Sequence, residues 1–274
     1  MSATLEVTIL GSGSSTGVPR VGGPDGKGDW GACDPTNPKN RRRRCSILLR
    51  RKGPGGETCV LVDTAPDLRE QLLSARVARL DAVLITHDHA DQLHGIDDLR
   101  AVAYAMRRRI DLYSDAQTME TIRQRFAYCF ETPGDSGYPP ILAAHGIPEP
   151  FQIFYVEGAG GSISVATFWQ QHGRVRSLGF RFGSVAYSSD VNALDEEAFG
   201  ILEGVEYWIV DALRRAPHPT HANVATALEW IERVRPKLGI LTNLHLELDY
   251  ETLKRELPPG IEPAFDGMTI AVAL

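Results

Sequence analysis

Three side chains that commonly bind metals alternate in the run Leu84-Ile-Thr-His-Asp-His-Ala-Asp-Gln92. They are His87, His89 and Asp91, and they directly follow an apolar stretch. In extended backbone every second side chain points the same way, so the three are expected to converge on one point. A single histidine here would more often be a core residue with satisfied hydrogen bonds. Three donors at this spacing favour a divalent metal such as zinc, iron or manganese.

Further metal donors must come from elsewhere in the chain. His172 follows the apolar stretch Ile163–Gln171, and Asp190 follows a second one at residues 185–189. Both are polar groups at the ends of expected strands, where sites gather in layered folds. Considered alone, each fits a metal ligand and an ordinary loop residue equally well.

Another pair of histidines lies in Pro217-His-Pro-Thr-His221, just before a segment with helical apolar spacing. With Thr220 as N-cap, His221 would lie in the first turn, where free N–H groups and the helix dipole attract phosphate. The dipole would also lower the pKa of this imidazole. We therefore expect His221 to act as a general acid or as a hydrogen-bond donor to phosphate, the alternative being an ordinary capping residue. Asp211, at the end of a strand, is expected to orient an imidazole of this segment.

The remaining sequence alternates strand and helix patterns, which predicts the elements that must hold these groups. Strands are expected at residues 5–10, 45–50, 58–63, 80–86, 151–157, 162–171, 178–188, 207–211, 239–242 and 268–272. Helices are expected at residues 67–75, 96–106, 117–130, 197–202 and 250–256, and from 222 onward. Glycine- and proline-rich loops are expected at 20–40 and 131–150, the second of them as a lid or a partner surface. This order favours two sheets packed face to face with helices outside. A doubly wound parallel sheet fits less well, because tight hairpins join several strands.

Composition limits the function classes. The chain has 274 residues, 43% of them apolar, which supports a large core and one domain over residues 1–274. A net charge of −6 argues against a nucleic-acid partner or an anionic membrane surface. The four cysteines, at 33, 45, 59 and 129, have no CxxC spacing and are expected to be buried thiols in a reducing, cytoplasmic compartment. No apolar run approaches the roughly 20 residues that span a bilayer.

Taken together, these motifs resemble those of the metallo-β-lactamase superfamily. The superfamily resemblance rests on Thr86-His-Asp-His-Ala-Asp91, Gln171-His172-Gly, Ser188-Ser-Asp190 and Thr242-Asn-Leu-His245. A narrower resemblance, to the group of the cyclic phosphodiesterase PhnP, rests on Leu10-Gly-Ser-Gly, Arg44-Cys-Ser, Asp63, Gly95-Ile-Asp-Asp-Leu-Arg100 and Phe265-Asp-Gly-Met268. The resemblance implies an α/β (α+β) fold, the four-layer αββα metallo-β-lactamase sandwich. The implied chemistry is attack of a metal-bound hydroxide on a small phosphodiester, such as a cyclic phosphate or a nucleotide.

The resemblance also implies a role for each matching residue. The residues assigned to metal binding are His87, His89, Asp91, His172 and Asp190, with Gln92 and Asn243 at two further ligand positions of the second metal. The three histidines would hold one divalent metal, Asp91 would bind a second, and Asp190 would bridge the two. Asp63 would orient a ligand imidazole. Asp91 and His221 would be the catalytic residues, with zinc or manganese bound and no organic cofactor.

Two positions depart from the family pattern. The family places ligand histidines where this chain has Gln92 and Asn243. Neutral amide oxygens bind zinc poorly, so the second metal should be weaker or should prefer manganese or magnesium. A histidine stands two residues beyond each loss, at His94 and His245. We hypothesise that one of them partly restores the second site; the alternative is an ordinary supporting or helix-capping role.

The substrate is expected to be a small phosphorylated molecule, including nucleotides, with Arg174 and Arg176 beside His172 as candidate contacts. Two alternatives stay open. One is a nucleotide- or phosphate-binding protein whose second metal site has degenerated. The other is a nuclease akin to RNase Z, which the acidic charge disfavours. Only Cys33 remains of the family's early cysteine cluster, so no structural zinc is expected. The resemblance alone suggests a homodimer.

Overall fold

The computed structural model describes residues 3–132, 134, 137–147, 149 and 152–274. Contacts between Cα atoms divide the chain into two compact units. Unit 1 consists of Met1–Thr8, Ser46–Ile163 and Thr269–Leu274, and unit 2 consists of Ile9–Cys45 and Ser164–Met268. Each unit carries candidate metal ligands.

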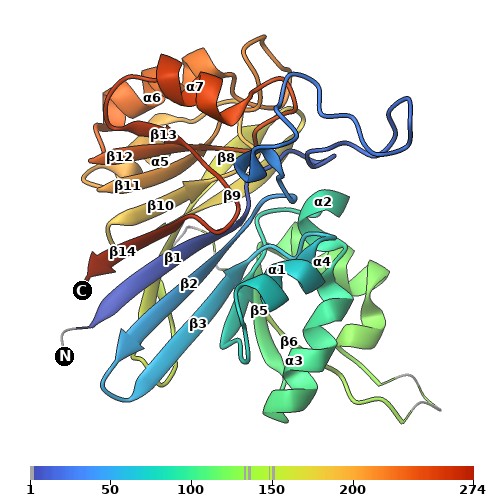
Figure 1. The fold of residues 1–274 in the computed structure, drawn as a ribbon. Helices are drawn as coiled ribbons and strands as arrows, with labels where there is room; N and C mark the ends of the chain where they lie inside the picture. The colour runs from blue at the N-terminus through green and yellow to red at the C-terminus, as the bar shows by residue number, and fades with distance from the viewer. Residues whose placement is uncertain (1–2, 133, 135–136, 148, 150–151) are drawn as a thin grey trace. The chain divides into compact units, whose positions relative to one another are not determined.

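The first sheet has seven strands in the order β14-β1-β2-β3-β4-β5-β6 (Figure 1). The strands are β1 Thr4–Gly11, β2 Ser46–Gly53, β3 Gly56–Val62, β4 Ala82–Leu84, β5 Ile110–Ser114, β6 Leu142–Gly146 and β14 Thr269–Ala273. The β2–β3 and β1–β14 pairs are antiparallel, whereas β3, β4, β5 and β6 pair in parallel. Parallel neighbours need crossover connections, and the helices supply them. These helices are α1 Leu68–Ser74, α2 Ala90–Leu93, α3 Leu99–Met106 and α4 Ala116–Arg125, with short 3-10 turns at Ile96–Asp98 and Ala127–Cys129.

The second sheet has seven strands in the order β13-β12-β11-β10-β9-β8-β7. The strands are β7 Phe154–Val156, β8 Ile163–His172, β9 Val175–Phe182, β10 Val185–Ser188, β11 Tyr207–Asp211, β12 Leu238–Thr242 and β13 Ile261–Pro263. Strands β8, β9 and β10 pair antiparallel, and β10 to β13 pair in parallel. The crossover helices are α5 Glu196–Leu202, α6 Val224–Val234 and α7 Tyr250–Glu256, and a 3-10 turn lies at Pro38–Asn40.

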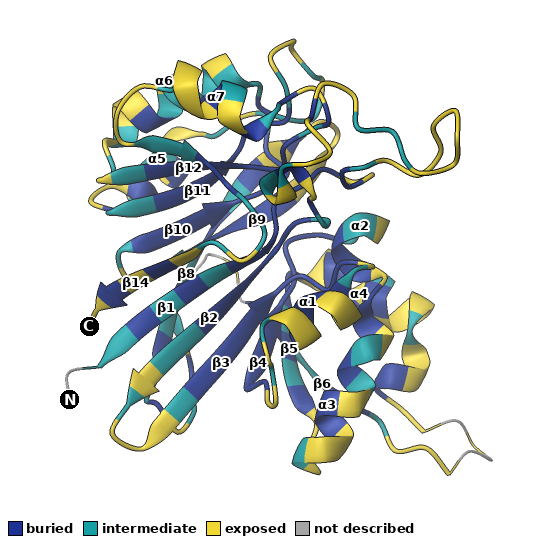
Figure 2. Ribbon diagram, in the orientation of Figure 1, coloured by how far each residue is buried: buried dark blue, intermediate teal, exposed yellow. Residues whose placement is uncertain are grey.

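Strands β10, β11 and β12 of the second sheet are buried along nearly their whole length (Figure 2). Trp208, on β11, is fully buried with residues of β12, α5 and α6, and its indole nitrogen donates to Ser188 Oγ at 3.0 Å. Because β10, β11 and β12 are parallel and in register, their carboxyl ends meet at one edge of the sheet. Ser188 pairs with Val210, and Asp211 pairs with Thr242. This edge therefore gathers the polar residues that end each strand.

The predicted α/β class with two sheets and flanking helices is confirmed, and most elements lie where the sequence placed them. The expected single strand at 178–188 is wrong: β9 and β10 form a hairpin there, turning at Gly183, whose φ is 60°. The expected loop at 131–150 contains strand β6, and part of that loop lies outside the described residues. Strands β5 and β13 and helix α2 were not predicted. Among the described residues, none of the helices is long and apolar enough to cross a membrane. The single domain over residues 1–274 stays a prediction.

Candidate metal centre

In unit 1, a chain of hydrogen bonds fixes the ring of His87. Asp63 follows β3 with a φ of 64°, and its carboxylate accepts from the Thr86 N–H at 2.8 Å and the Thr86 hydroxyl at 3.0 Å. The Thr86 hydroxyl can donate only one proton, so it accepts from His87 Nδ1–H at 3.0 Å. Asp63 therefore orients His87 through Thr86. Sequence reasoning overlooked Thr86, although it directly precedes the first histidine of the motif.

The segment that carries the motif is extended only as far as its second histidine. The rings of His87 and His89 lie with centroids 4.5 Å apart and in an edge-on arrangement, as the two-residue spacing predicts. His89 is exposed and is the N-cap of α2, so Asp91 lies in the first turn of that helix. The expectation that all three side chains alternate along extended backbone is therefore wrong for Asp91. Its direction is set by the helix.

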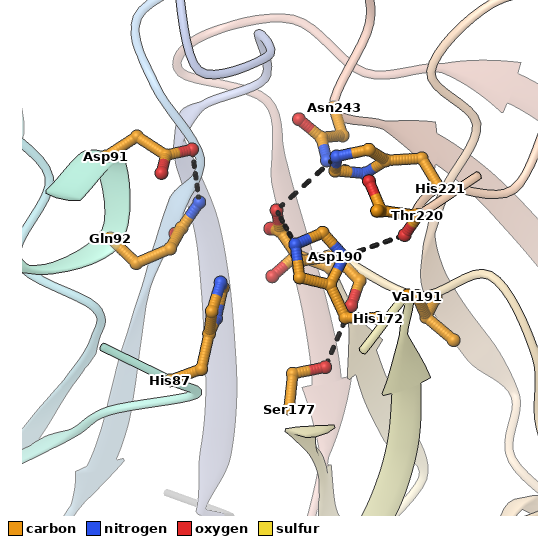
Figure 3. Close-up of polar contacts among 12 residues, drawn as sticks. His87, Asp91, Gln92, His172, Ser177, Asp190, Val191, Thr220, His221 and Asn243 are labelled. Atoms are coloured by element: carbon orange, nitrogen blue, oxygen red, sulfur yellow. Dashed lines mark hydrogen bonds and ion pairs between the residues drawn. The ribbon is translucent and has the colours of Figure 1, made fainter. Parts of the chain in front are cut away.

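The side-chain amide of Gln92 is hydrogen-bonded to the side chain of the preceding residue, Asp91. Gln92 is 1% exposed, and its Nε2 donates to Asp91 Oδ2 at 3.2 Å (Figure 3). Thr64 holds this turn in place, because its N–H donates to the Gln92 carbonyl at 2.8 Å and its hydroxyl donates to the Leu93 carbonyl at 2.9 Å. The described contact of Gln92 is thus a hydrogen bond that supports a carboxylate.

In unit 2, His172 and Asp190 meet at the polar edge of the second sheet. His172 ends β8 and is 4% exposed, and its Nδ1 lies 2.7 Å from the Thr220 carbonyl oxygen. Asp190 follows β10 with a φ of 53°, and its own carbonyl accepts from Ser177 Oγ at 2.8 Å. The His172 Nε2 atom lies 3.9 Å from Asp190 Oδ1. Both side chains were predicted as ligands, and the fold places them together.

His221 belongs to the same cluster. Its Nδ1 lies 2.7 Å from Asp211 Oδ2 and its Nε2 lies 4.0 Å from Asp190 Oδ1. The donor atoms of His172, Asp190 and His221 all lie within 4.8 Å of one another. Asp211 was expected to orient an imidazole here, and its contact with His221 has that geometry.

The expected place of His221 on a helix is wrong. Helix α6 begins at Val224, and its N-cap is Asn223, whose Oδ1 accepts from the Thr226 N–H at 2.8 Å. His221 therefore precedes the helix, and Thr220 is not the cap. His221 therefore lies outside the first turn of the helix, where the helix dipole acts.

Asn243 also contacts this pair. It follows β12 with a φ of 61°, and its Nδ2 lies 3.1 Å from His221 Nδ1. Burial raises the pKa of Asp211, although the ion pair with His221 and the hydrogen bond from the Val191 N–H act to lower it. The Asn243 amide thus lies against the ring of His221.

The remaining predicted residues lie apart from these clusters. His94 is exposed at the end of α2, with its ring 5.7 Å from that of Phe126. His245 Nδ1 lies 3.4 Å from Glu247 Oε1, and burial lowers the pKa of this imidazole. Within the described ranges, neither belongs to a group of three metal donors.

The two arginines beside His172 differ in their surroundings. Arg176 stacks its guanidinium over the Trp169 ring at 4.0 Å, and Arg174 is exposed in the preceding turn. In the early loop, Cys33 is buried, with its Sγ 3.4 Å from the Leu246 carbonyl.

Comparison with known proteins agrees with this geometry. A model of the Beta-lactamase superfamily domain matches residues 58–243. A protein named octanoyltransferase from Porphyromonas gingivalis is 31% identical over 268 residues, which cover 96% of this chain but 51% of that protein. The chain thus spans about half the length of the curated relative it matches.

Solved structures show the same likeness. A crystal structure described as a new diphosphatase from the PhnP family is 30% identical, with a TM-score of 0.87 over 100% of this chain and 99% of that chain. The zinc-bound PqqB of Methylobacterium extorquens is 18% identical and has the same fold, with a TM-score of 0.72 over 97% of this chain and 99% of that one. The motifs, the fold and these matches together establish that the chain belongs to the β-lactamase superfamily, as a hydrolase with the metallo-β-lactamase fold that resembles the PhnP family.

Proposed function

We propose that this protein is a metal-dependent phosphodiesterase that acts on small cyclic phosphates or nucleotides. The observation that carries the proposal is the state of its buried histidines. His87 and His172 each place Nδ1 against an oxygen atom, at 3.0 and 2.7 Å. With the proton on Nδ1, the lone pair lies on Nε2, as a metal ligand requires.

The donor set fits zinc or manganese. Imidazole nitrogens with carboxylate oxygens suit both ions, whereas magnesium and calcium prefer oxygen alone. We assign His87, His89 and His172 to the first metal and Asp190 to a bridging position, with Asp91 as a ligand of the second. A divalent metal bound there would supply Lewis acidity and would lower the pKa of a bound water. No organic cofactor is part of the proposal.

The substrate class rests on phosphoryl chemistry and charge. The PhnP-family relative at 30% identity is described as a diphosphatase, so its substrate also carries phosphoryl groups. The net charge of −6 disfavours a long RNA substrate, because phosphate backbones are held mainly by positive side chains. We therefore favour a small substrate over an RNase Z-like role. We place the reaction in the cytoplasm, since all four cysteines are free thiols. A homodimer stays a prediction.

The acyl-transfer activity named for the Porphyromonas relative is not part of this proposal. That protein is about twice as long as the matched region, and the match covers 51% of it. We expect the purified chain to show no octanoyl transfer.

A substrate panel with defined metals tests the proposal. Metal-free protein is loaded with zinc or manganese and assayed on bis(p-nitrophenyl) phosphate, 2′,3′-cyclic nucleotides and nucleoside diphosphates. We expect metal-dependent cleavage of the diesters, lost in His87→Ala and in His172→Ala. A matched control is Thr167→Val, because the buried Thr167 hydroxyl has no hydrogen-bond partner among the described residues. Binding of AMP or GMP without turnover under any metal would favour the phosphate-binding protein instead.

A further inference from the structure

We propose that the end of helix α3 forms a second ligand site, which binds a small molecule with a phosphate group and a planar ring, the chemistry of a nucleotide. A hollow of about 570 Å³ carries the inference. Its lining includes Tyr104, Tyr138 and the three consecutive arginines Arg107, Arg108 and Arg109. All of them belong to unit 1. The inference goes beyond the proposed function and does not rest on it.

The arginines give this hollow a positive charge that the protein does not neutralise. Arg108 pairs with Asp81 at 2.7 Å. The side chains of Arg107 and Arg109 are exposed, and they make no hydrogen bond or ion pair with any residue that the structure describes. Each guanidinium presents five N–H donors in a planar fork, which matches the oxygens of a phosphate. A phosphate in the hollow would therefore meet two guanidinium groups that have no other partner among the described residues.

A second hollow in unit 1, of about 500 Å³, has its cations arranged differently. Arg50, Lys52, Arg76 and Arg79 line it. Three of these four cations, all but Arg76, pair with an acid, at distances of 2.7–3.3 Å. Most of the positive charge is thus balanced by acids of the chain itself. The hollow at α3 differs because two of its three arginines are left without an acid.

Flat rings form another part of the lining at α3. Tyr104 and Tyr138 are exposed, and Pro139 and Pro140 lie on the same wall as Tyr138. Aromatic side chains stack on nucleobases, whichever base is present. The volume is also that of a small-molecule pocket, which typically measures roughly 300–1,000 Å³. The rings therefore favour a nucleotide over an inorganic anion.

The backbone of Arg107 is an independent sign that this side chain is needed. Arg107 is the C-cap of α3 and has a φ of 53°, in the left-handed region. Glycine is the usual residue at such a helix end, because a Cβ is strained there. A simpler explanation of the arginines is that cations stabilise the negative end of the helix dipole. That effect is confined to the last turn, however, and Arg109 lies beyond it, directly before β5.

The hollow lies at the edge of the first sheet opposite to the metal-binding motif. Strands β4 and β5 are parallel, and Leu84 pairs with Tyr113. His87 follows the carboxyl end of β4, whereas Arg109 precedes the amino end of β5 (Figure 1). The two positions are therefore separated by the length of β5, roughly 15 Å. A nucleotide held by Arg107 and Arg109 would not contact His87, so this is a separate site.

Calorimetric titration with AMP tests the inference on the metal-loaded protein and on Arg107→Gly, Arg109→Ala and Arg235→Gly. Arg235 is the matched control, because it is also an exposed arginine at a helix C-cap, with a φ of 55°, but it belongs to unit 2. Glycine relieves the backbone in both cases, so both glycine variants should unfold at higher urea concentrations than wild type. AMP bound at the metal centre is the same in all four proteins, and differences between them report on the hollow.

We expect the affinity for AMP to fall roughly tenfold or more in Arg107→Gly and in Arg109→Ala, as for the loss of a charge-assisted hydrogen bond. It should stay at the wild-type value in Arg235→Gly. A protein that is more stable yet binds AMP more weakly would exclude unfolding as the cause. Equal affinities in all four proteins, or no AMP binding beyond the metal centre, would overturn the inference.

A second titration, with inorganic pyrophosphate, separates the phosphate from the ring. Tyr138→Ala should weaken AMP binding and leave pyrophosphate binding unchanged, and photoactivated 8-azido-AMP should label the peptide that carries Tyr104 or Tyr138. If Tyr138→Ala binds AMP as tightly as wild type does, the hollow is an anion site without nucleotide chemistry and the inference is wrong. Phosphodiester cleavage enters none of these measurements, so the inference and the proposed function can fail separately.

Discussion

Individual histidines in this chain are defined by the atoms behind them. His87, His172 and His221 each direct Nδ1 at an oxygen, which belongs to a hydroxyl, a carbonyl and a carboxylate respectively. Of these three acceptors only the Asp211 carboxylate is an ionisable acid. Because hydrogen bonds to a charged acceptor are the stronger ones, Asp211 fixes the ring of His221 more firmly than a neutral acceptor would.

The relay through Thr86 gives a prediction for a single hydroxyl. The substitution Thr86→Val removes the hydroxyl that hydrogen-bonds both to Asp63 and to His87 Nδ1. On the proposed function, we expect the affinity for the first metal to fall roughly 10- to 100-fold, as for other residues that support a ligand. Isothermal titration with Zn²⁺ measures it, with Thr167→Val as the control. Equal affinities in both variants would show that the Asp63–Thr86 chain does not support metal binding.

Asp249 predicts a pH dependence away from the metal ligands. It is the N-cap of α7, and its carboxylate accepts from Thr252 N–H at 3.0 Å and Asn40 Nδ2 at 2.7 Å. Partial burial acts to raise its pKa, but these hydrogen bonds outweigh it and lower the pKa from 3.8 to about 2. Its stabilisation is therefore complete above about pH 4 and is lost as the pH falls through 2.

The variant Asp249→Asn keeps a capping oxygen but removes the charge. We expect it to be less stable than wild type by roughly 1–2 kcal/mol at pH 7, with the difference shrinking below pH 4. Urea unfolding at several pH values measures the free energies of unfolding. A difference that stays constant from pH 7 to pH 3 would contradict the argument.

At the level of elements, strand ends determine which side chains meet. Periodicity predicted β11 with its observed bounds, because Tyr207–Asp211 is an apolar run closed by an acid. The meeting of Asp211 with Asn243 could not be predicted, since it depends on the parallel pairing of Asp211 with Thr242. Helix α2 is a single turn of four residues, too short for any periodic signal. The side-chain direction expected for Asp91 was therefore wrong, because no periodic signal marks the helix that begins at Ala90.

The start of α6 shows the same limit at a helix end. Thr220 and Asn223 are both good capping residues, and sequence alone does not decide which one is used. Thr220 lies in the loop that precedes α6. Its carbonyl accepts a hydrogen bond from His172, and its methyl group packs beside Gly173. That interaction joins residues 48 positions apart in sequence, which no local pattern records.

The turn after helix α2 is tightly packed at Gly95. A Cβ at this position would lie 2.0 Å from the Ala65 carbonyl oxygen, which is backbone and cannot rotate away. Its N–H also donates to the Thr64 carbonyl at 2.8 Å. We expect Gly95→Ala to destabilise the protein by roughly 1–3 kcal/mol through overpacking. Urea unfolding measures the change.

The control for this substitution is Gly200→Ala in helix α5. A Cβ on Gly200 meets nothing within 4 Å. Alanine there should stabilise the protein by about 0.5–1 kcal/mol, as expected for glycine in a helix interior. If both substitutions change stability in the same direction, the close approach at Gly95 is not what determines the effect.

At the scale of the whole molecule, the chain passes repeatedly from one compact unit to the other. Strand β1 (Thr4–Gly11) begins in unit 1 and ends in unit 2, since the boundary lies at Thr8, and β8 (Ile163–His172) crosses the boundary at Ile163. A strand cannot lose half of its hydrogen-bonded ladder without disturbing the rest. We therefore predict that the two units unfold together, as one domain would.

The four cysteines can report on this prediction, because two lie in each unit. Cys59 and Cys129 belong to unit 1, and Cys33 and Cys45 belong to unit 2; all four are free and buried. Burial raises the pKa of Cys59 to about 12 and that of Cys129 to about 11, and it also raises the pKa of the other two. Since thiolates are the reactive form, none of the four should react quickly in the native protein at pH 8.

Labelling across a urea series then separates the two outcomes. Short pulses of a thiol reagent, followed by peptide mass spectrometry, give a labelling midpoint for each cysteine. With cooperative unfolding, all four midpoints coincide with one another and with the loss of circular dichroism. Separate midpoints for the Cys59–Cys129 pair and the Cys33–Cys45 pair would show two independently folding units. Because each cysteine is scored within the same molecule, reagent strength and urea concentration affect all four equally, and a difference between pairs can come only from the order in which the units open.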